Sequence, residues 1–230
     1  YERGRAKAMA KDRFRAMEKL TEHRDGQLRI VSQPPLIVSI EDIAGGRSED
    51  EIREYIDHLL RAYRRSVADA AGVLLDQYRY VHAARKVVGV GSVGTRCWIV
   101  LLVGRDESDP LFLQVKEAEA SALAPYVARS RYRHEGRRVV EGQRIMQATG
   151  DSLLGWMSAE GVDGKTREFD VRQLWDGKAS VNVAIMDPNL LGAYGELCGA
   201  TLARAHARGG DRIAMAGYLG KGHTFTEAMT

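Results

Sequence analysis

Three glycines, Gly89, Gly91 and Gly94, are the feature of the sequence that most suggests chemistry. They lie in the stretch VVGVGSVGTRCWIVLLVG, residues 87–104. A backbone without side chains can approach phosphate oxygens closely, and its N–H groups can then donate to them. Ser92 could add a hydroxyl donor at the loop tip, with an ordinary turn serine as an equal alternative. The stretch predicts either a phosphate-covering loop or a plain hairpin turn.

The segment after the glycines distinguishes between classes of nucleotide site. Residues 95–103 are rich in β-branched and aromatic residues, which predicts a strand. A dinucleotide-binding fingerprint needs a helix at this place, and a P-loop needs a Gly-Lys-Ser/Thr ending, which is absent from the sequence. A glycine loop between two strands is how protein-kinase-like folds cover the phosphates of ATP.

That arrangement requires a lysine on the next strand and a helical carboxylate to orient it. Residues 111–116 read Leu-Phe-Leu-Gln-Val-Lys, an apolar strand that ends in Lys116. Lys116 could contact the phosphates as a point charge; the alternative is a lysine that ends a strand in solvent. Glu141 follows an apolar Val-Val pair on a helix predicted near residues 135–147, so we expect it to face inward. Glu135 is the competing carboxylate, and an ordinary surface glutamate is the alternative role for Glu141.

The other predicted elements surround this hairpin. Ser48-Glu49-Asp50-Glu51 is a capping box, and it predicts a helix that continues to about Tyr78. A last helix near residues 189–207 should bury a stripe of its apolar side chains. Further strands are predicted at residues 28–31, 36–40, 87–88, 98–103, 111–115 and 169–174, with one more around 153–156.

Composition excludes several classes of protein. The 230 residues carry a net charge of +3, so no global basic field indicates nucleic acid. A basic run, residues 129–138, leaves nucleic-acid binding as a weaker alternative, with a solvated surface as the default. No apolar run is long enough for a membrane helix. The two cysteines, Cys97 and Cys198, are expected to be reduced core residues, which predicts a cytoplasmic protein.

Several motifs together resemble one bacterial family. They are Gly-Val-Gly-Ser-Val-Gly-Thr-Arg (89–96), Leu-Phe-Leu-Gln-Val-Lys-Glu-Ala (111–118), Val-Val-Glu-Gly-Gln-Arg (139–144), Val-Arg-Gln-Leu (171–174) and Leu-Ala-Arg-Ala-His-Ala-Arg (202–208). The set resembles the family labelled domain of unknown function 2252. The resemblance implies a distant member of the protein-kinase-like superfamily with its parts in a rearranged order.

The same resemblance implies that catalytic parts lie outside this sequence. The family has a Gly-Asp-Ala-His stretch followed by Asn, and an Asp-Phe-Asp stretch, both upstream of the region matched here. This sequence has neither, so we expect a fragment of a longer chain, no catalytic residue within it, and Mg²⁺ binding only with ligands from outside it.

The sequence therefore predicts an α+β, protein-kinase-like fold, with a small antiparallel sheet lobe carrying one helix and a helical lobe. Residues 1–80 should be mostly helical and should belong to, or pack on, the larger lobe. Residues 85–180 should form the sheet lobe, and residues 185–230 should return to the helical lobe. The expected function is binding of ATP or another nucleotide, with phosphoryl transfer to an unknown acceptor in the full-length form. The alternative is a non-catalytic, pseudokinase-like binding module.

Overall fold

A computed structural model describes residues 13–89, 94–174 and 181–229 of the chain. Its contacts divide the chain into two compact units. The first contains the described residues up to Val140 and those from Asp151 to Leu174, and the second contains residues 141–150 and 181–229. The fold is mixed α+β, as predicted. Among the described helices, none has both the length and the apolarity to cross a bilayer.

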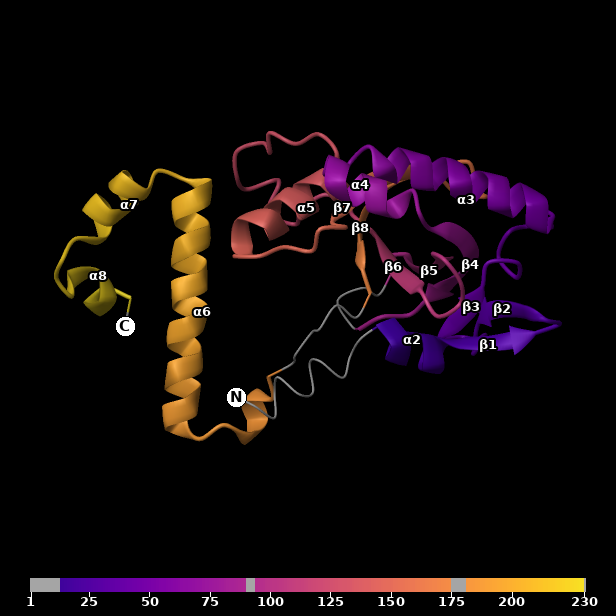
Figure 1. The fold of residues 1–230 in the computed structure, drawn as a ribbon. Coiled ribbons are helices and arrows are strands. Elements are labelled where there is room, and N and C mark those ends of the chain that lie inside the picture. The colour runs from indigo at the N-terminus through magenta and orange to yellow at the C-terminus, as the bar shows by residue number, and fades with distance from the viewer. Residues whose placement is uncertain (1–12, 90–93, 175–180, 230) are drawn as a thin grey trace. The chain divides into compact units, whose positions relative to one another are not determined.

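The first unit is built on a six-stranded antiparallel sheet (Figure 1). Its spatial order is β3-β4-β5-β6-β8-β7. The two central strands are apolar on both faces and almost wholly buried, which is typical of strands covered on both sides. The strands are β3 (Ile37–Ser39), β4 (Arg79–Lys86), β5 (Cys97–Val103), β6 (Pro110–Glu117), β7 (Gly155–Glu160) and β8 (Thr166–Gln173).

One face of the sheet is covered by α3 (Glu49–Arg64) and α4 (Asp69–Leu75). The predicted capping box begins α3: the Ser48 hydroxyl accepts from the Glu51 N–H, and the Glu51 carboxylate accepts from the Ser48 N–H. The buried side of α3 presents Ile52, Ile56, Leu59 and Tyr63 to the sheet. These positions follow the helical period of the sequence.

The prediction of one helix that continues to Tyr78 is wrong, because the helix ends at Arg64 and a second helix, α4, begins at Asp69. The Ser66 hydroxyl donates to the Tyr63 carbonyl at 2.7 Å and accepts from the Trp156 N–H at 2.8 Å. A serine that bonds to the backbone of another segment favours a turn over a continued helix. The break lets Val67 turn into the core.

The opposite face of the sheet is partly covered by α2 (Arg13–Leu20) and the hairpin of β1 (Thr21–Arg24) and β2 (Gln27–Ile30) (Figure 1). Residues 1–80 are predicted to be mostly helical, yet their described part, from Arg13 on, also contains three strands and the start of a fourth. A second apolar cluster forms here, from Ala16, Leu20, Leu28, Ile30, Ile37, Ala84, Ile99, Leu101, Val103, Phe112 and Leu174.

Strand β4 lies earlier in the chain than the sequence pattern predicts. Its residues, RYVHAARK, are largely polar or small, and the sequence pattern instead predicts the strand at the apolar pair Val87-Val88. The strand forms because tertiary partners lie on both sides of it, β3 and β5. By contrast, α5 (Glu135–Met146) matches the helix predicted near residues 135–147.

The second unit is helical and sparsely packed. It holds η2 (Val183–Ile185), α6 (Pro188–Gly209), α7 (Arg212–Leu219) and α8 (Thr224–Glu227). The Arg208 guanidinium donates to the carbonyls of Ile145, in the last turn of α5, and of Gln147, just after it, at 3.1 and 2.8 Å. It thereby ties α6 to the end of α5.

The predicted buried stripe of α6 is wrong. Within the described part of this unit, Ala205 is the sole buried residue, while Leu190, Leu197 and Leu202 are exposed. Cys198 is exposed as well, and only Cys97 is the core cysteine that the sequence predicted. Helical periodicity marks which face is apolar, but packing decides whether that face is covered.

Candidate functional site

The glycine loop lies between two antiparallel strands, as the sequence predicted. Strands β4 and β5 pair with Arg85 opposite Trp98, and residues 87–96 connect them. Gly89 and Gly94 are exposed. Gly94 has a φ of +90°, a conformation that side-chain-bearing residues rarely adopt. Gly91 and Ser92 lie outside the described residues, so their predicted contact with phosphate stays a prediction.

Lys116 lies at the end of the sheet where this loop emerges. It is near the end of β6, directly opposite Cys97, the first residue of β5 after the loop. The lysine is half-buried. Strand pairing therefore brings together the glycine hairpin and the lysine that the sequence predicted for it.

Strand pairing also gives Lys116 a neighbour that the sequence analysis did not single out. Asp170 of β8 is the direct cross-strand partner of Lys116. Only 7% of the surface of Asp170 is exposed. Directly opposed side chains in an antiparallel pair have Cβ atoms about 4.5–5.5 Å apart. Sequence alternation could have found Asp170, because its neighbours Phe169 and Val171 are apolar and pack on the α3 side.

These side chains belong to a polar group on the sheet face opposite α3. We call it the Lys116 cluster. Two of its members are joined by hydrogen bonds: the Arg172 guanidinium donates to the Gln114 side-chain carbonyl, at 3.0 and 2.8 Å. The cluster consists of Lys86, Cys97, Gln114, Lys116, Asp170 and Arg172.

Electrostatics within the cluster favour an anionic ligand. Burial raises the pKa of Asp170, although Arg172 and Lys116 oppose the rise. Burial also lowers the pKa of Lys86 and raises that of the Cys97 thiol. The thiol is therefore held in its protonated form, which is not the nucleophilic one. Basic side chains outnumber the one carboxylate, so the cluster can balance added negative charge.

The carboxylates proposed to orient Lys116 have partners of their own. Glu141 pairs with Arg144, one turn along α5, at 3.1 Å. Glu135 pairs with Arg138, and its N–H donates to the Glu168 carboxylate at 2.6 Å. Glu141 and Lys116 belong to different units, and their pairing stays a prediction.

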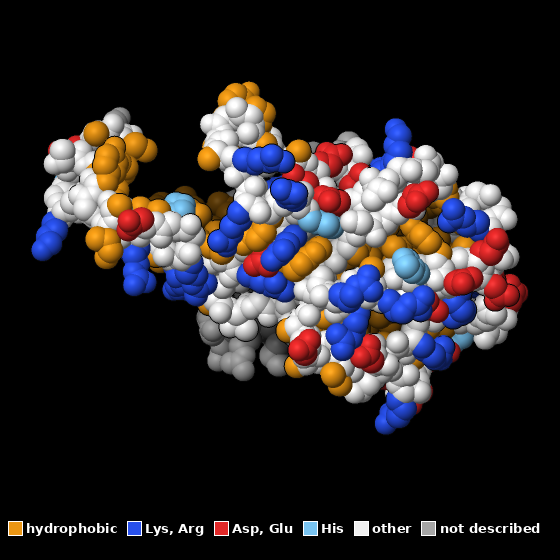
Figure 2. Space-filling model, turned by 90° about the horizontal axis from the view of Figure 1, so that it is seen from above, with side chains coloured by type: hydrophobic (Ala, Val, Ile, Leu, Met, Phe, Trp, Pro, Cys, Tyr) orange, Lys and Arg blue, Asp and Glu red, His pale blue; other side chains and the backbone are white. Residues whose placement is uncertain are grey.

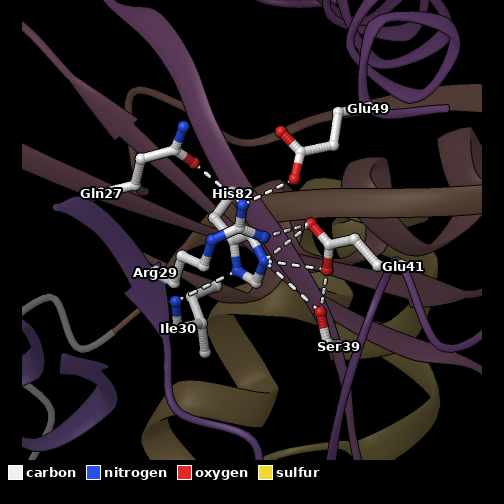
Figure 3. Close-up of polar contacts among 7 residues, drawn as sticks. All are labelled: Gln27, Arg29, Ile30, Ser39, Glu41, Glu49 and His82. Carbon is white, nitrogen blue, oxygen red and sulfur yellow. Dashed lines mark hydrogen bonds and ion pairs between the residues drawn. The ribbon is translucent and has the colours of Figure 1, made fainter. Parts of the chain in front are cut away.

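A second polar cluster, shown in Figure 3, has the residue types of a Ser-His-Glu triad. The Nε2 atom of His82 lies 3.1 Å from both carboxylate oxygens of Glu41. The Ser39 hydroxyl lies 3.4 Å from this same Nε2 and also donates to Glu41. The backbone N–H of Ile30 donates to Nδ1 of His82 at 3.0 Å.

This arrangement cannot activate a nucleophile. In a triad the histidine uses one ring nitrogen for the serine and the other for the acid. Here Nδ1 of His82 is occupied by a backbone N–H, and the serine and the acid share Nε2. Burial lowers the pKa of His82. The cluster instead fastens β2, β3 and β4 to one another, and Arg29 extends it by bonding Glu41 at 3.0 Å and Glu49 at 2.6 Å.

The basic segment 129–138 is partly engaged in contacts within the first unit. The guanidinium of Arg137 lies 5.4 Å from the ring centre of Tyr132 and 5.2 Å from that of Trp156. Arg138 donates to the Glu119 carbonyl at 2.8 Å. In the part of the chain that the structure describes, no group of three or more His, Cys, Asp or Glu side chains is placed to hold a metal ion.

Comparison with known proteins gives the family. A family model described as "Uncharacterized protein conserved in bacteria (DUF2252)" matches residues 2–230. The chain belongs to this family. No curated protein and no solved structure matches the DUF2252 chain. The family resemblance drawn from the sequence motifs is thereby confirmed at the level of the family.

Proposed function

We propose that this chain binds ATP or another nucleotide at the glycine hairpin, on the sheet face that carries the Lys116 cluster. One observation supports the proposal above all others: the register of β5 and β6 places Lys116 directly opposite Cys97, where β5 begins after the glycine loop. A lysine at that place can neutralise phosphates that the loop covers.

The order of elements supports a protein-kinase-like version of the site. Along the chain, the glycine hairpin of β4 and β5 is followed by the lysine strand β6, the helix α5, and the strands β7 and β8. Protein kinases likewise place a glycine-rich loop before the lysine strand and take the lysine's carboxylate partner from the helix that follows. In this version Glu141 orients Lys116, and Gly89, Gly91, Ser92 and Gly94 cover the phosphates.

The proposal has two forms, one with phosphoryl transfer and one with nucleotide binding alone. Phosphoryl transfer needs a group that orients the acceptor and carboxylate or amide ligands for Mg²⁺. With such groups supplied from outside these residues, the full-length protein is a phosphotransferase with an acceptor still to be found. Without them, the chain is a pseudokinase-like module that binds nucleotide only.

The deciding experiment is a thermal-shift titration with ATP, with and without Mg²⁺. It compares wild type, Lys116→Ala, and the matched control Lys165→Ala, which removes an exposed lysine in the β7–β8 turn. A ligand that binds only the folded state raises Tm, by roughly 5–10 °C at about a hundredfold excess over Kd for a chain of this size.

We expect this rise in wild type and in Lys165→Ala, and a much smaller rise in Lys116→Ala. No rise in wild type, or equal rises in all three proteins, would reject the site. A rise that does not depend on Mg²⁺, without hydrolysis of ATP, would favour the non-catalytic module.

Nucleic-acid binding through residues 129–138 is the alternative that the structure favours least. Contacts to the phosphate backbone would make affinity for DNA or RNA fall steeply with salt. Because Arg137 and Arg138 already have partners within the protein, we expect weak binding without a steep salt dependence.

A further inference from the structure

A cavity of about 380 Å³ lies between α3 and the sheet, on the sheet face opposite the Lys116 cluster. This volume is within the range of small-molecule sites, about 300–1,000 Å³. Its walls come from α3, the segment after β3, and strands β4 to β8. The interior is apolar and includes Ile43, Ile56, Trp98, Val115, Met157 and Phe169. Phosphates bound at the Lys116 cluster would lie on the opposite face, so this cavity is a separate site.

Arginines outnumber carboxylates around this cavity. Four arginines line it, together with Glu160 and Asp163. Two of the arginines are neutralised: Arg96 pairs with Glu117 at 3.1 Å, and Arg167 pairs with Asp163 at 2.6 Å. Basic side chains also lie side by side on the face viewed in Figure 2, the side from which α3 and α4 are seen, with hydrophobic side chains between them.

The other two arginines keep their charge available. Arg47 is exposed and lies over the ring of Tyr55, 5.6 Å from its centre. Arg85, near the end of β4, is exposed beside its cross-strand partner Trp98. Within the described residues, neither guanidinium forms an ion pair with a carboxylate.

We propose that this cavity binds an amphiphilic carboxylate, a fatty acid of medium chain length. The apolar walls would cover the hydrocarbon tail, because burial of apolar surface is the main favourable term in such sites. Arg85 and Arg47 would bind the carboxylate, for which the planar guanidinium is a geometrically matched donor. Arg47 and Arg85, two arginines without an ion pair among the described residues, suit a ligand at this apolar cavity that is both apolar and anionic, and suit a neutral lipid poorly.

The test uses isothermal titration with decanoate below its micelle concentration, and with decanol as the uncharged probe. The variants are Arg85→Gln and the matched control Arg79→Gln, an exposed arginine at the other end of the same strand. A third variant, Ala159→Phe, fills the cavity from the edge strand β7 without changing its charge.

We expect one decanoate to bind per chain, with weaker binding of decanol. Arg85→Gln should weaken decanoate binding about tenfold or more, as expected for loss of a charge-assisted hydrogen bond, while Arg79→Gln leaves it unchanged. Ala159→Phe should abolish binding; if this variant unfolds, the Arg85→Gln and Arg79→Gln pair decides.

Three results would overturn the proposal: no decanoate binding to wild type, equal binding of decanol, or equal losses in the Arg85→Gln and Arg79→Gln variants. The Lys116→Ala variant separates this site from the nucleotide site. It should bind decanoate as wild type does, whatever its response to ATP, and competition between ATP and decanoate would contradict two separate sites.

Discussion

At the scale of single residues, Asp170 is a carboxylate whose burial opposes its ionisation. Its carboxylate is buried beside Lys116, and burial raises its pKa above the ordinary value. An acid whose pKa is raised by folding makes the folded state more stable at low pH, and that stability is lost as pH rises through the folded pKa. Residues that bind ligands often reduce stability in this way.

We therefore predict that Asp170→Asn is more stable than wild type at pH 7.5. Asparagine has a similar shape and does not ionise. Because Asp170 becomes neutral at low pH, the stability advantage of the variant should shrink as pH falls toward about 4. Urea unfolding at several pH values measures the difference, and the exposed Asp42→Asn controls for the change in net charge. An Asp170→Asn variant less stable than wild type at pH 7.5 would show that Lys116 and Arg172 outweigh the burial.

At the scale of elements, the contact of α5 with the sheet depends on a glycine. Gly136 lies in the first turn of α5, where an added Cβ would overlap the carbonyl oxygen of Phe169. Gly142 lies in the same helix, and among the described atoms an added Cβ would meet nothing within 4 Å. The helix therefore packs closely on β8 at Gly136, whereas Gly142 has room for a side chain among the described atoms.

We predict opposite effects for the two alanine substitutions. Gly142→Ala should stabilise by up to about 1 kcal/mol, because alanine favours a helix over glycine. Gly136→Ala should destabilise by about 1–3 kcal/mol, since the backbone must shift to admit a methyl group. Thermal unfolding of both variants makes the comparison, and a stabilised Gly136→Ala would mean that α5 does not pack on β8 this closely.

At the scale of the whole molecule, the two units differ in how much they bury. The central strands β5 and β6 are almost wholly buried, whereas α6, α7 and α8 together bury Ala205 alone among their described residues. Local unfolding takes least free energy where few apolar contacts are buried.

Hydrogen exchange should follow this difference. We predict that backbone amides of α6 to α8 exchange faster than those of β5 and β6, by roughly a hundredfold or more, because they open without unfolding of the sheet. Mass spectrometry of peptides from each region measures the rates. Equal protection in both regions would show that the second unit unfolds only with the first.

The sequence by itself determined the features that depend on local chemistry. The Ser48 capping box, helix α5, the apolar strands β5 and β6, and a glycine loop between strands all follow from propensity and spacing along the chain. The motifs were also enough to identify the family.

Tertiary structure decided what depends on partners distant in the sequence. Strand β4 is too polar to be recognised locally, and it exists because β3 and β5 pair with it. Asp170 is a neighbour of Lys116 only through the register of β6 and β8. The apolar face of α6 looked like a buried stripe, yet Leu190 and Leu197 are exposed. Period and propensity fix which side chains share a face, whereas burial requires a second surface, and that surface is chosen by the fold.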